Sequence, residues 1–74
     1  MAGVRIGLVG AGSMGSLHAR VVSESPRADL AWIADPSRPA GEAAATRFGT
    51  TWLPHLRTDD VDAVVVAAAT EAHP

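Results

Sequence analysis

Three glycines at fixed spacing, Gly10-x-Gly12-x-x-Gly15, are the residues of this 74-residue chain best suited to chemistry. Gly10 permits a tight turn, and Gly12, which lacks a Cβ, lets a bulky anion approach the backbone. Gly15 lets the next element pack closely on the preceding one. An apolar run precedes the triplet and a helical pattern follows it. A strand, a glycine turn and a helix in this order predict binding of a dinucleotide pyrophosphate.

Backbone N–H groups, rather than cationic side chains, are expected to hold that pyrophosphate. Those near Ser13 and Met14 fall in the first turn of the expected helix, where they lack partners within the helix and the helix dipole adds partial positive charge. The phosphate-binding residues expected on this basis are Gly10, Ala11, Gly12, Ser13, Met14 and Gly15. A glycine-rich turn without a ligand is the alternative interpretation of the same residues.

Asp35, twenty positions after Gly15, ends the next expected strand. A carboxylate there can accept hydrogen bonds from both ribose hydroxyls of the adenosine half. Its charge would repel a 2′-phosphate, so NAD is the expected cofactor and NADP the alternative. Arg38 complicates this preference, because its guanidinium could stack on adenine, which both cofactors carry, or neutralise the 2′-phosphate of NADP. Asp35 could instead cap the following turn, and Arg38 could be an ordinary solvated charge.

The remaining candidate side chains point to structure rather than to chemistry. His18 falls on the apolar face of the first expected helix, which favours a packed residue over an active-site role. His55 falls in a loop. Asp59, Asp60 and Asp62 form an acidic cluster before the last apolar run, but nothing else supplies converging oxygens for a metal ion. No metal site is therefore predicted.

The positions of these residues depend on alternating strands and helices. Apolar periodicity predicts strands at residues 4–9, 30–34, 50–53 and 63–68, and helices at 13–24 and 40–48. Gly49 is a C-terminal cap for the second helix, and residues 54–60 form a loop or a single helical turn. This order predicts an α/β fold, a Rossmann-like, partial doubly wound parallel sheet with strand order 3-2-1-4, right-handed crossovers and helices on its faces.

Three packing details follow from the same pattern. Gly7 inside the first strand suggests close approach of another backbone segment. Trp32 alternates with its neighbours in the second strand and is expected in the core, whereas Trp52 is expected to be partly exposed. Helical spacing places one apolar face on the first helix, made of Met14, Leu17, His18, Val21 and Val22.

Composition excludes several classes of function. The hydrophobic content is 47% and the formal net charge is −2, typical of a globular chain rather than a disordered one. All six basic residues are scattered arginines, so no basic stripe suits a nucleic acid. The chain has no cysteine, no apolar stretch of membrane-spanning length and no signal-peptide pattern. A cytoplasmic location without nucleic-acid or membrane partners is the default expectation.

Motifs at both ends of the chain resemble one oxidoreductase family. The run Ile-Gly-Leu-Val-Gly-Ala-Gly-Ser-Met-Gly at residues 6–15, with His18 after it, is similar to the start of the glucose–fructose oxidoreductase, inositol dehydrogenase and rhizopine-catabolism family. Residues 61–67 and the following Thr70-Glu71-Ala72-His73 resemble its fourth strand and next loop. Two alanines, at positions 68 and 69, replace the Thr and Pro of the family pattern. The resemblance implies that Thr70 and His73 lie near the cofactor.

The resemblance also implies an activity and a division into domains. Family members are NAD(P)-dependent oxidoreductases acting mainly on sugars and cyclitols, with a Rossmann domain followed by a substrate domain. Residues 1–74 would be the N-terminal part of the dinucleotide-binding domain, and the catalytic Glu-Lys-Pro segment and the C-terminal substrate domain are absent from the chain. The parent would be an NAD(P)-dependent dehydrogenase with a small-molecule substrate. The chain alone, which contains no expected catalytic residue, would be inactive.

The last apolar strand predicts one further partner, a second copy of the chain. An uncovered apolar edge strand can pair with another chain, so self-association is expected. Two alternative functions stay open: an enzyme of the dihydrodipicolinate reductase or aspartate dehydrogenase type, and a non-catalytic dinucleotide-sensing regulatory domain. The presence of His18 and the loop at residues 70–73 argues against the sensor. The fold alone does not decide between them.

Overall fold

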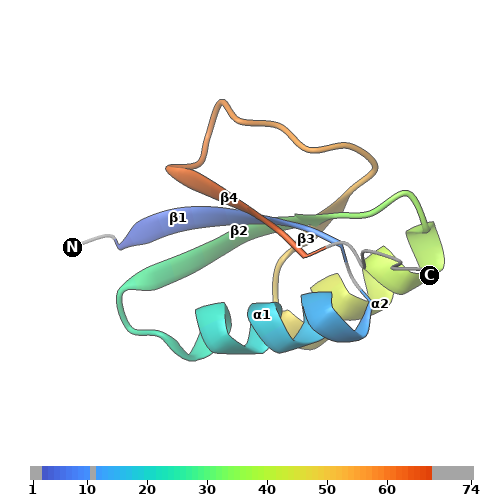
Figure 1. Ribbon diagram of the computed structural model, residues 1–74, viewed down its shortest axis with the longest axis horizontal. Coiled ribbons are helices and arrows are strands. Elements are labelled where there is room, and N and C mark those ends of the chain that lie inside the picture. The colour runs from blue at the N-terminus through green and yellow to red at the C-terminus, as the bar shows by residue number, and fades with distance from the viewer. Residues whose placement is uncertain (1–2, 11, 68–74) are drawn as a thin grey trace, which may run out of the picture.

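A four-stranded parallel β-sheet organises the chain in the computed structural model, which describes residues 3–10 and 12–67 (Figure 1). The strand order is β3-β2-β1-β4, which confirms the predicted order 3-2-1-4. Along the chain the elements are β1 (Val4–Val9), α1 (Ser13–Glu24), β2 (Ala28–Ala34), α2 (Arg38–Phe48), β3 (Thr51–Leu53) and β4 (Ala63–Val66).

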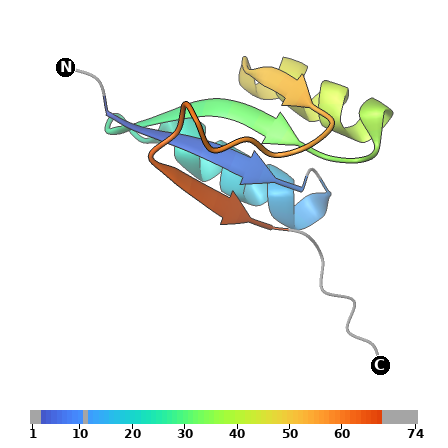
Figure 2. The same cartoon turned by 90° about the horizontal axis from the view of Figure 1, so that it is seen from above.

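Both helices lie on the same face of the sheet (Figure 1). The crossovers β1-α1-β2 and β2-α2-β3 step in the same direction, and two crossovers of the same hand place their helices on one side. Figure 2 shows the segment between β3 and β4, coloured orange, passing over the opposite face. Of the two forms predicted for residues 54–60, a loop or a single helical turn, the structure shows the loop. This segment consists of bends and turns that cover the sheet.

The boundaries of β1 and α1 are as predicted, and those of the other elements differ slightly. β2 begins at Ala28, two residues early, because Ala28 and Asp29 pair with the first residues of β1. α2 begins at Arg38 rather than at residue 40, with Ser37 as its N-cap and Pro39 in its first turn, where proline is well tolerated. Gly49 caps α2 with φ of 69°, the left-handed conformation expected of it.

The core lies between the sheet and the two helices. Fully buried Leu8 and Ile33 pack there with Ala19, Ala44 and Ala67. The apolar face predicted for α1 is partly wrong: Val22 is buried, but Leu17 and Val21 are 50% and 59% exposed. Among the described residues, the buried ones of α1 are Gly15, Ala19 and Val22, so the face of α1 that packs on β1 and β2 is turned from the predicted one.

Gly7 and Trp32 pack together on the opposite face of the sheet. The prediction that another backbone approaches Gly7 is wrong, since a Cβ at this position would collide with the indole ring of Trp32. Trp32 is 2% exposed, as expected for a core residue, and its Nε1–H donates to Asp60 Oδ1 at 3.3 Å. The missing side chain of Gly7 therefore provides the space in which Trp32 is buried.

Candidate functional site

The glycine turn begins at Gly10, at the carboxyl end of β1. Gly10 has φ of 106°, a conformation that side chains with a Cβ rarely adopt, so glycine is required for this turn. Its N–H donates to the carbonyl oxygen of Ala34 at 2.8 Å. The turn is thereby fixed to the last residue of β2, immediately before Asp35.

Gly12 stands at the start of α1, in front of the N–H groups of its first turn. Gly12 is the N-cap, and its carbonyl oxygen accepts the helical hydrogen bond from Ser16 at 2.8 Å. The N–H groups of residues 13–15 therefore have no partner within the helix. The first turn contains no acidic residue, and a Cβ at Gly12 would meet no heavy atom within 4 Å. Open space beside Gly12, together with donors that have no partner within the helix, suits an anion such as a pyrophosphate.

Gly15 keeps the helix against the turn. A Cβ at this position would collide with the carbonyl oxygen of Gly10. Any other residue would push α1 away from the end of β1, and with it the N–H groups that face the open space. The structure thus bears out the close packing expected at Gly15.

Asp35 follows β2, so it lies with the glycine turn at the carboxyl ends of the parallel strands. Its N–H donates to the carbonyl oxygen of Leu53 at 3.1 Å, and its Oδ1 accepts from the N–H of Ser37 at 2.7 Å. Asp35 therefore caps the turn that leads into α2, as the alternative interpretation held. A carboxylate offers about four acceptor positions, so capping is compatible with recognition of ribose hydroxyls.

Arg38 is held by two side chains. Its Nε lies 2.9 Å from Glu42 Oε2, and its guanidinium carbon lies 5.5 Å from the centre of the Trp52 ring. The Nε1–H of Trp52 in turn donates to the carbonyl oxygen of Asp35 at 3.0 Å. Sequence reasoning missed both partners. The Arg38–Glu42 spacing of four residues was a readable signal, whereas Trp52 is brought here by the pairing of β3 with β2.

Other candidate residues lie apart from this end of the sheet or outside the described part of the chain. Ala11, Thr70 and His73 fall outside the described residues. His18 is half-buried on α1 and His55 is exposed. Among the described residues, no group of three or more His, Cys, Asp or Glu could hold a metal ion, and no helix is long and apolar enough to cross a membrane.

The acidic cluster before β4 lies near the amino ends of β1 and β4. Its residues pair with arginines and backbone N–H groups and do not form a binding site. Asp62 Oδ2 accepts from the N–H of Arg5 at 2.8 Å, and the Arg5 guanidinium lies 3.7 Å from Asp60. Asp59 pairs with Arg57 at 3.2 Å. The hydrogen bond from Arg57 and its positive charge lower the pKa of Asp59. These contacts agree with the predicted capping and surface-charge roles.

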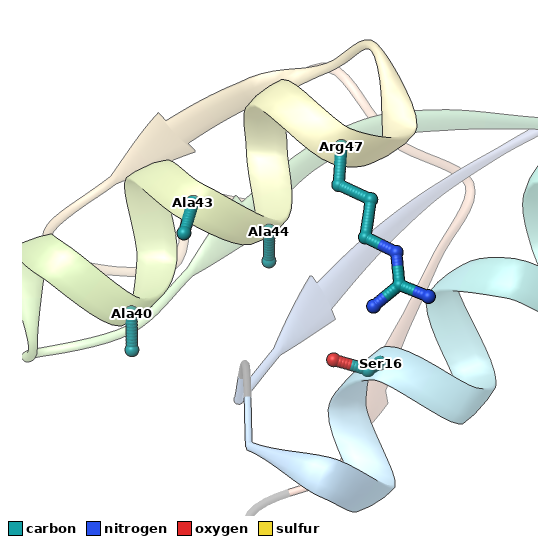
Figure 3. A pocket seen from close by; sticks show the side chains of 5 residues that line it. All are labelled: Ser16, Ala40, Ala43, Ala44 and Arg47. Atoms are coloured by element: carbon teal, nitrogen blue, oxygen red, sulfur yellow. The ribbon is translucent and has the colours of Figure 1, made fainter.

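A shallow cavity of about 270 Å³ lies between the two helices, where it is lined on α1 by Ser16, the residue after Gly15. Figure 3 shows the Arg47 side chain reaching from α2 toward Ser16 on α1. The other lining residues are Ala40, Ala43 and Ala44, so the cavity is bounded mainly by methyl groups. Among the described residues, Gly10, Gly12, Gly15 and Asp35 do not line it.

Comparison with known proteins gives a consistent relationship. Residues 4–74 match the model of a family described as an oxidoreductase family with an NAD-binding Rossmann fold. The chain is 39% identical over 77 residues to inositol 2-dehydrogenase of Rhizobium meliloti, covering 95% of this chain and 22% of that protein. It therefore spans about a fifth of the length of this relative.

Solved structures give the same relationship. GenD2 from gentamicin A biosynthesis, solved in complex with NAD, is 38% identical with a TM-score of 0.84 over 92% of this chain and 21% of its own. A myo-inositol dehydrogenase from Lactobacillus casei, in complex with NAD(H) and myo-inositol, is 29% identical with a TM-score of 0.81. That match covers 92% of this chain and 22% of the dehydrogenase.

Proposed function

The chain belongs to the oxidoreductase family with an NAD-binding Rossmann fold, and from this premise we propose that it is the N-terminal part of the dinucleotide-binding domain of a polyol dehydrogenase. The parent protein would transfer hydride between nicotinamide and a hydroxyl-bearing carbon of a cyclitol or sugar. Two features support the substrate class. The relative from Rhizobium meliloti is an inositol 2-dehydrogenase, and the Lactobacillus casei enzyme was solved with myo-inositol.

One observation carries the cofactor-binding role: the open space beside Gly12, the N-cap of α1. We propose that the N–H groups of residues 13–15 hold the pyrophosphate there, close to Gly10, and that Ala11 of the same motif also contacts it. Asp35 would accept the hydroxyls of the adenosine ribose, since it lies beside the turn and keeps a carboxylate at that end of the sheet. Thr70 and His73 are proposed to face the cofactor on the strength of the family resemblance.

Bound NAD would supply the hydride acceptor, and the residues of this chain would position it. Catalytic residues are proposed to lie in the remainder of the parent, so residues 1–74 alone would bind the cofactor without turnover. The dehydrogenase relatives also favour an enzyme over a dinucleotide-sensing domain.

Calorimetric titration of the 74-residue chain with NAD tests the binding role. Wild type is expected to bind NAD, and Gly12→Ala to weaken binding at least tenfold, because the new methyl group fills the space in front of the donors. The same variant should lose at most about 1 kcal/mol of stability, the order of a poor N-cap residue. Normal NAD affinity in a folded Gly12→Ala chain would contradict the proposal.

Substrate class is tested separately on the parent protein by NADH formation with myo-inositol and with sugars. Oxidation of these polyols by the parent, and none by the 74-residue chain, is expected. Steady polyol turnover by the chain alone would contradict the proposed division of labour.

A further inference from the structure

Arg38 is the cation nearest in sequence to Asp35, yet its side chain is directed along α2. Its partner Glu42 lies one helical turn further from the N-terminus of the helix, and the Nε–Oε2 distance is 2.9 Å. Asp35 lies three residues before Arg38, and its Oδ1 accepts from the N–H of Ser37. The guanidinium is thus engaged by Glu42 within α2, a carboxylate other than the one proposed to bind the ribose.

Trp52 provides the second restraint. Its ring lies against the Arg38 guanidinium at 5.5 Å, an arrangement that attracts a cation to the aromatic face. The ring itself is fixed, since its Nε1–H donates to the carbonyl oxygen of Asp35 at 3.0 Å. A Cβ at Gly41 would collide with the same ring, so Trp52 also packs tightly on α2.

We propose that Glu42 and Trp52 are positioning residues that restrain Arg38 and so keep the cofactor site selective for NAD over NADP. This inference rests on the proposed binding of a dinucleotide at Asp35. An arginine near the acidic residue is the group that accommodates a 2′-phosphate in this fold. Here the charges of Asp35 and Glu42 outnumber that of Arg38, so a 2′-phosphate meets a net negative surrounding.

Glu42→Gln tests the restraint, because it removes the charge and keeps the size of the side chain. Arg38 is 70% exposed, so once released it can turn toward the ribose. The dissociation constant for NADP is expected to fall roughly threefold to tenfold, with that for NAD changed less than about twofold, as expected for a partly screened charge. Glu42→Ala, which also removes the hydrogen bond, should give at least as large a gain.

A matched control is available on α1. Arg20 and Glu24 form an ion pair with the same i,i+4 spacing and a longer Nε–Oε2 distance of 3.9 Å, at the end of α1 far from the glycine turn. Glu24→Gln makes the same change in net charge and should leave the NADP-to-NAD affinity ratio unaltered. Adding Arg38→Gln to Glu42→Gln should abolish the gain for NADP, because the released cation is then absent.

Calorimetric titration of each folded variant with NAD and NADP distinguishes the outcomes. A wild-type chain that binds neither dinucleotide overturns the proposed function and this inference with it. A wild-type chain that binds NAD, combined with an unchanged affinity ratio in Glu42→Gln, overturns this inference alone. So does an equal change in ratio in Glu24→Gln, since the effect would then follow net charge and not Arg38.

Discussion

The carbonyl oxygen of Gly10 occupies the space that a Cβ on Gly15 would need. This contact joins the end of β1 to the first turn of α1 through backbone atoms. Gly12, between them in sequence, makes no comparable contact, because a Cβ there would meet only open space. Three glycines of one motif therefore serve different purposes: Gly10 and Gly15 maintain the fold, and Gly12 keeps a space open.

Gly15→Ala should destabilise the chain far more than Gly12→Ala does. The added methyl must displace backbone rather than a flexible side chain, and overpacking of this kind costs about 1–3 kcal/mol. Urea denaturation followed by circular dichroism measures the free energy of unfolding of both variants. Equal stability of the two variants would contradict the collision at Gly15.

Gly7→Ala should also destabilise the fold, but through Trp32. A cost of about 1–3 kcal/mol is expected when the methyl meets the indole ring. In a Trp32→Leu background the ring is absent, so the same change should cost much less. A double-mutant cycle should therefore show coupling of at least about 0.5 kcal/mol, as for residues in direct contact. If the free-energy changes of Gly7→Ala and Trp32→Leu simply add in the double variant, the methyl group does not collide with the Trp32 ring.

Asp35→Asn and Asp35→Ala should separate the two roles of this residue. Asn keeps an oxygen for the N–H of Ser37, so stability should change little, whereas Ala should lose about 1 kcal/mol with the cap. Both variants should bind NAD more weakly and discriminate less against NADP, because the carboxylate charge is gone. Titration with both dinucleotides measures the discrimination, and thermal unfolding measures the stability. An unaltered NADP-to-NAD affinity ratio in Asp35→Asn would argue against repulsion of the 2′-phosphate by the carboxylate charge.

Asp59 should titrate at a lower pH than an ordinary aspartate. The hydrogen bond from Arg57 and its charge lower the pKa of Asp59, so Arg57→Gln should return it toward the usual range in an NMR titration. A lowered folded-state pKa gives stability above the unfolded-state pKa that is lost as the pH falls through the folded value.

The stability of the Arg57→Gln chain should nevertheless match that of wild type from neutral to acidic pH. Both groups are exposed and only two residues apart, so the pair also forms in the unfolded chain. A clear loss of stability at neutral pH would contradict this local interpretation.

Self-association remains a prediction, and β4 is the element to test. β4 is an edge strand among the described residues, and Val66 on it is 68% exposed. Val66→Lys should lower any concentration-dependent association seen by sedimentation, because a charged edge disfavours pairing with another strand. Thr51→Lys, at the opposite edge on β3, is the matched control. Association that is unchanged by Val66→Lys would exclude this edge as the contact.

The topology was predictable because local signals agreed with it. The apolar run before Gly10 and the helical pattern after it gave β1 and α1 their observed bounds, and Gly49 marked the end of α2. Boundaries failed where a partner strand decided them: Ala28 and Asp29 have weak strand preference, yet they pair with β1.

Contacts between elements could not be read from local patterns. Periodicity gave α1 an apolar face but not which side of the helix packs on the sheet, so it did not predict that Leu17 and Val21 would be exposed. The ring that fills the space above Gly7 and the ring that restrains Arg38 both depend on strand register. The register of a strand depends on how all the strands of the sheet pair, so it cannot be read from a short segment. The glycine motif, in contrast, is recognisable within the six residues 10–15.

The hydrogen bond from Gly10 to Ala34 has a consequence for ligand affinity. It couples the turn proposed for the pyrophosphate to the residue before Asp35, so the two contact points of a bridging ligand keep a fixed separation. Their conformational freedom is lost during folding and not when the ligand arrives, which makes the site preorganised. A small chain can therefore offer a binding surface whose entropy loss on association falls mainly on the ligand.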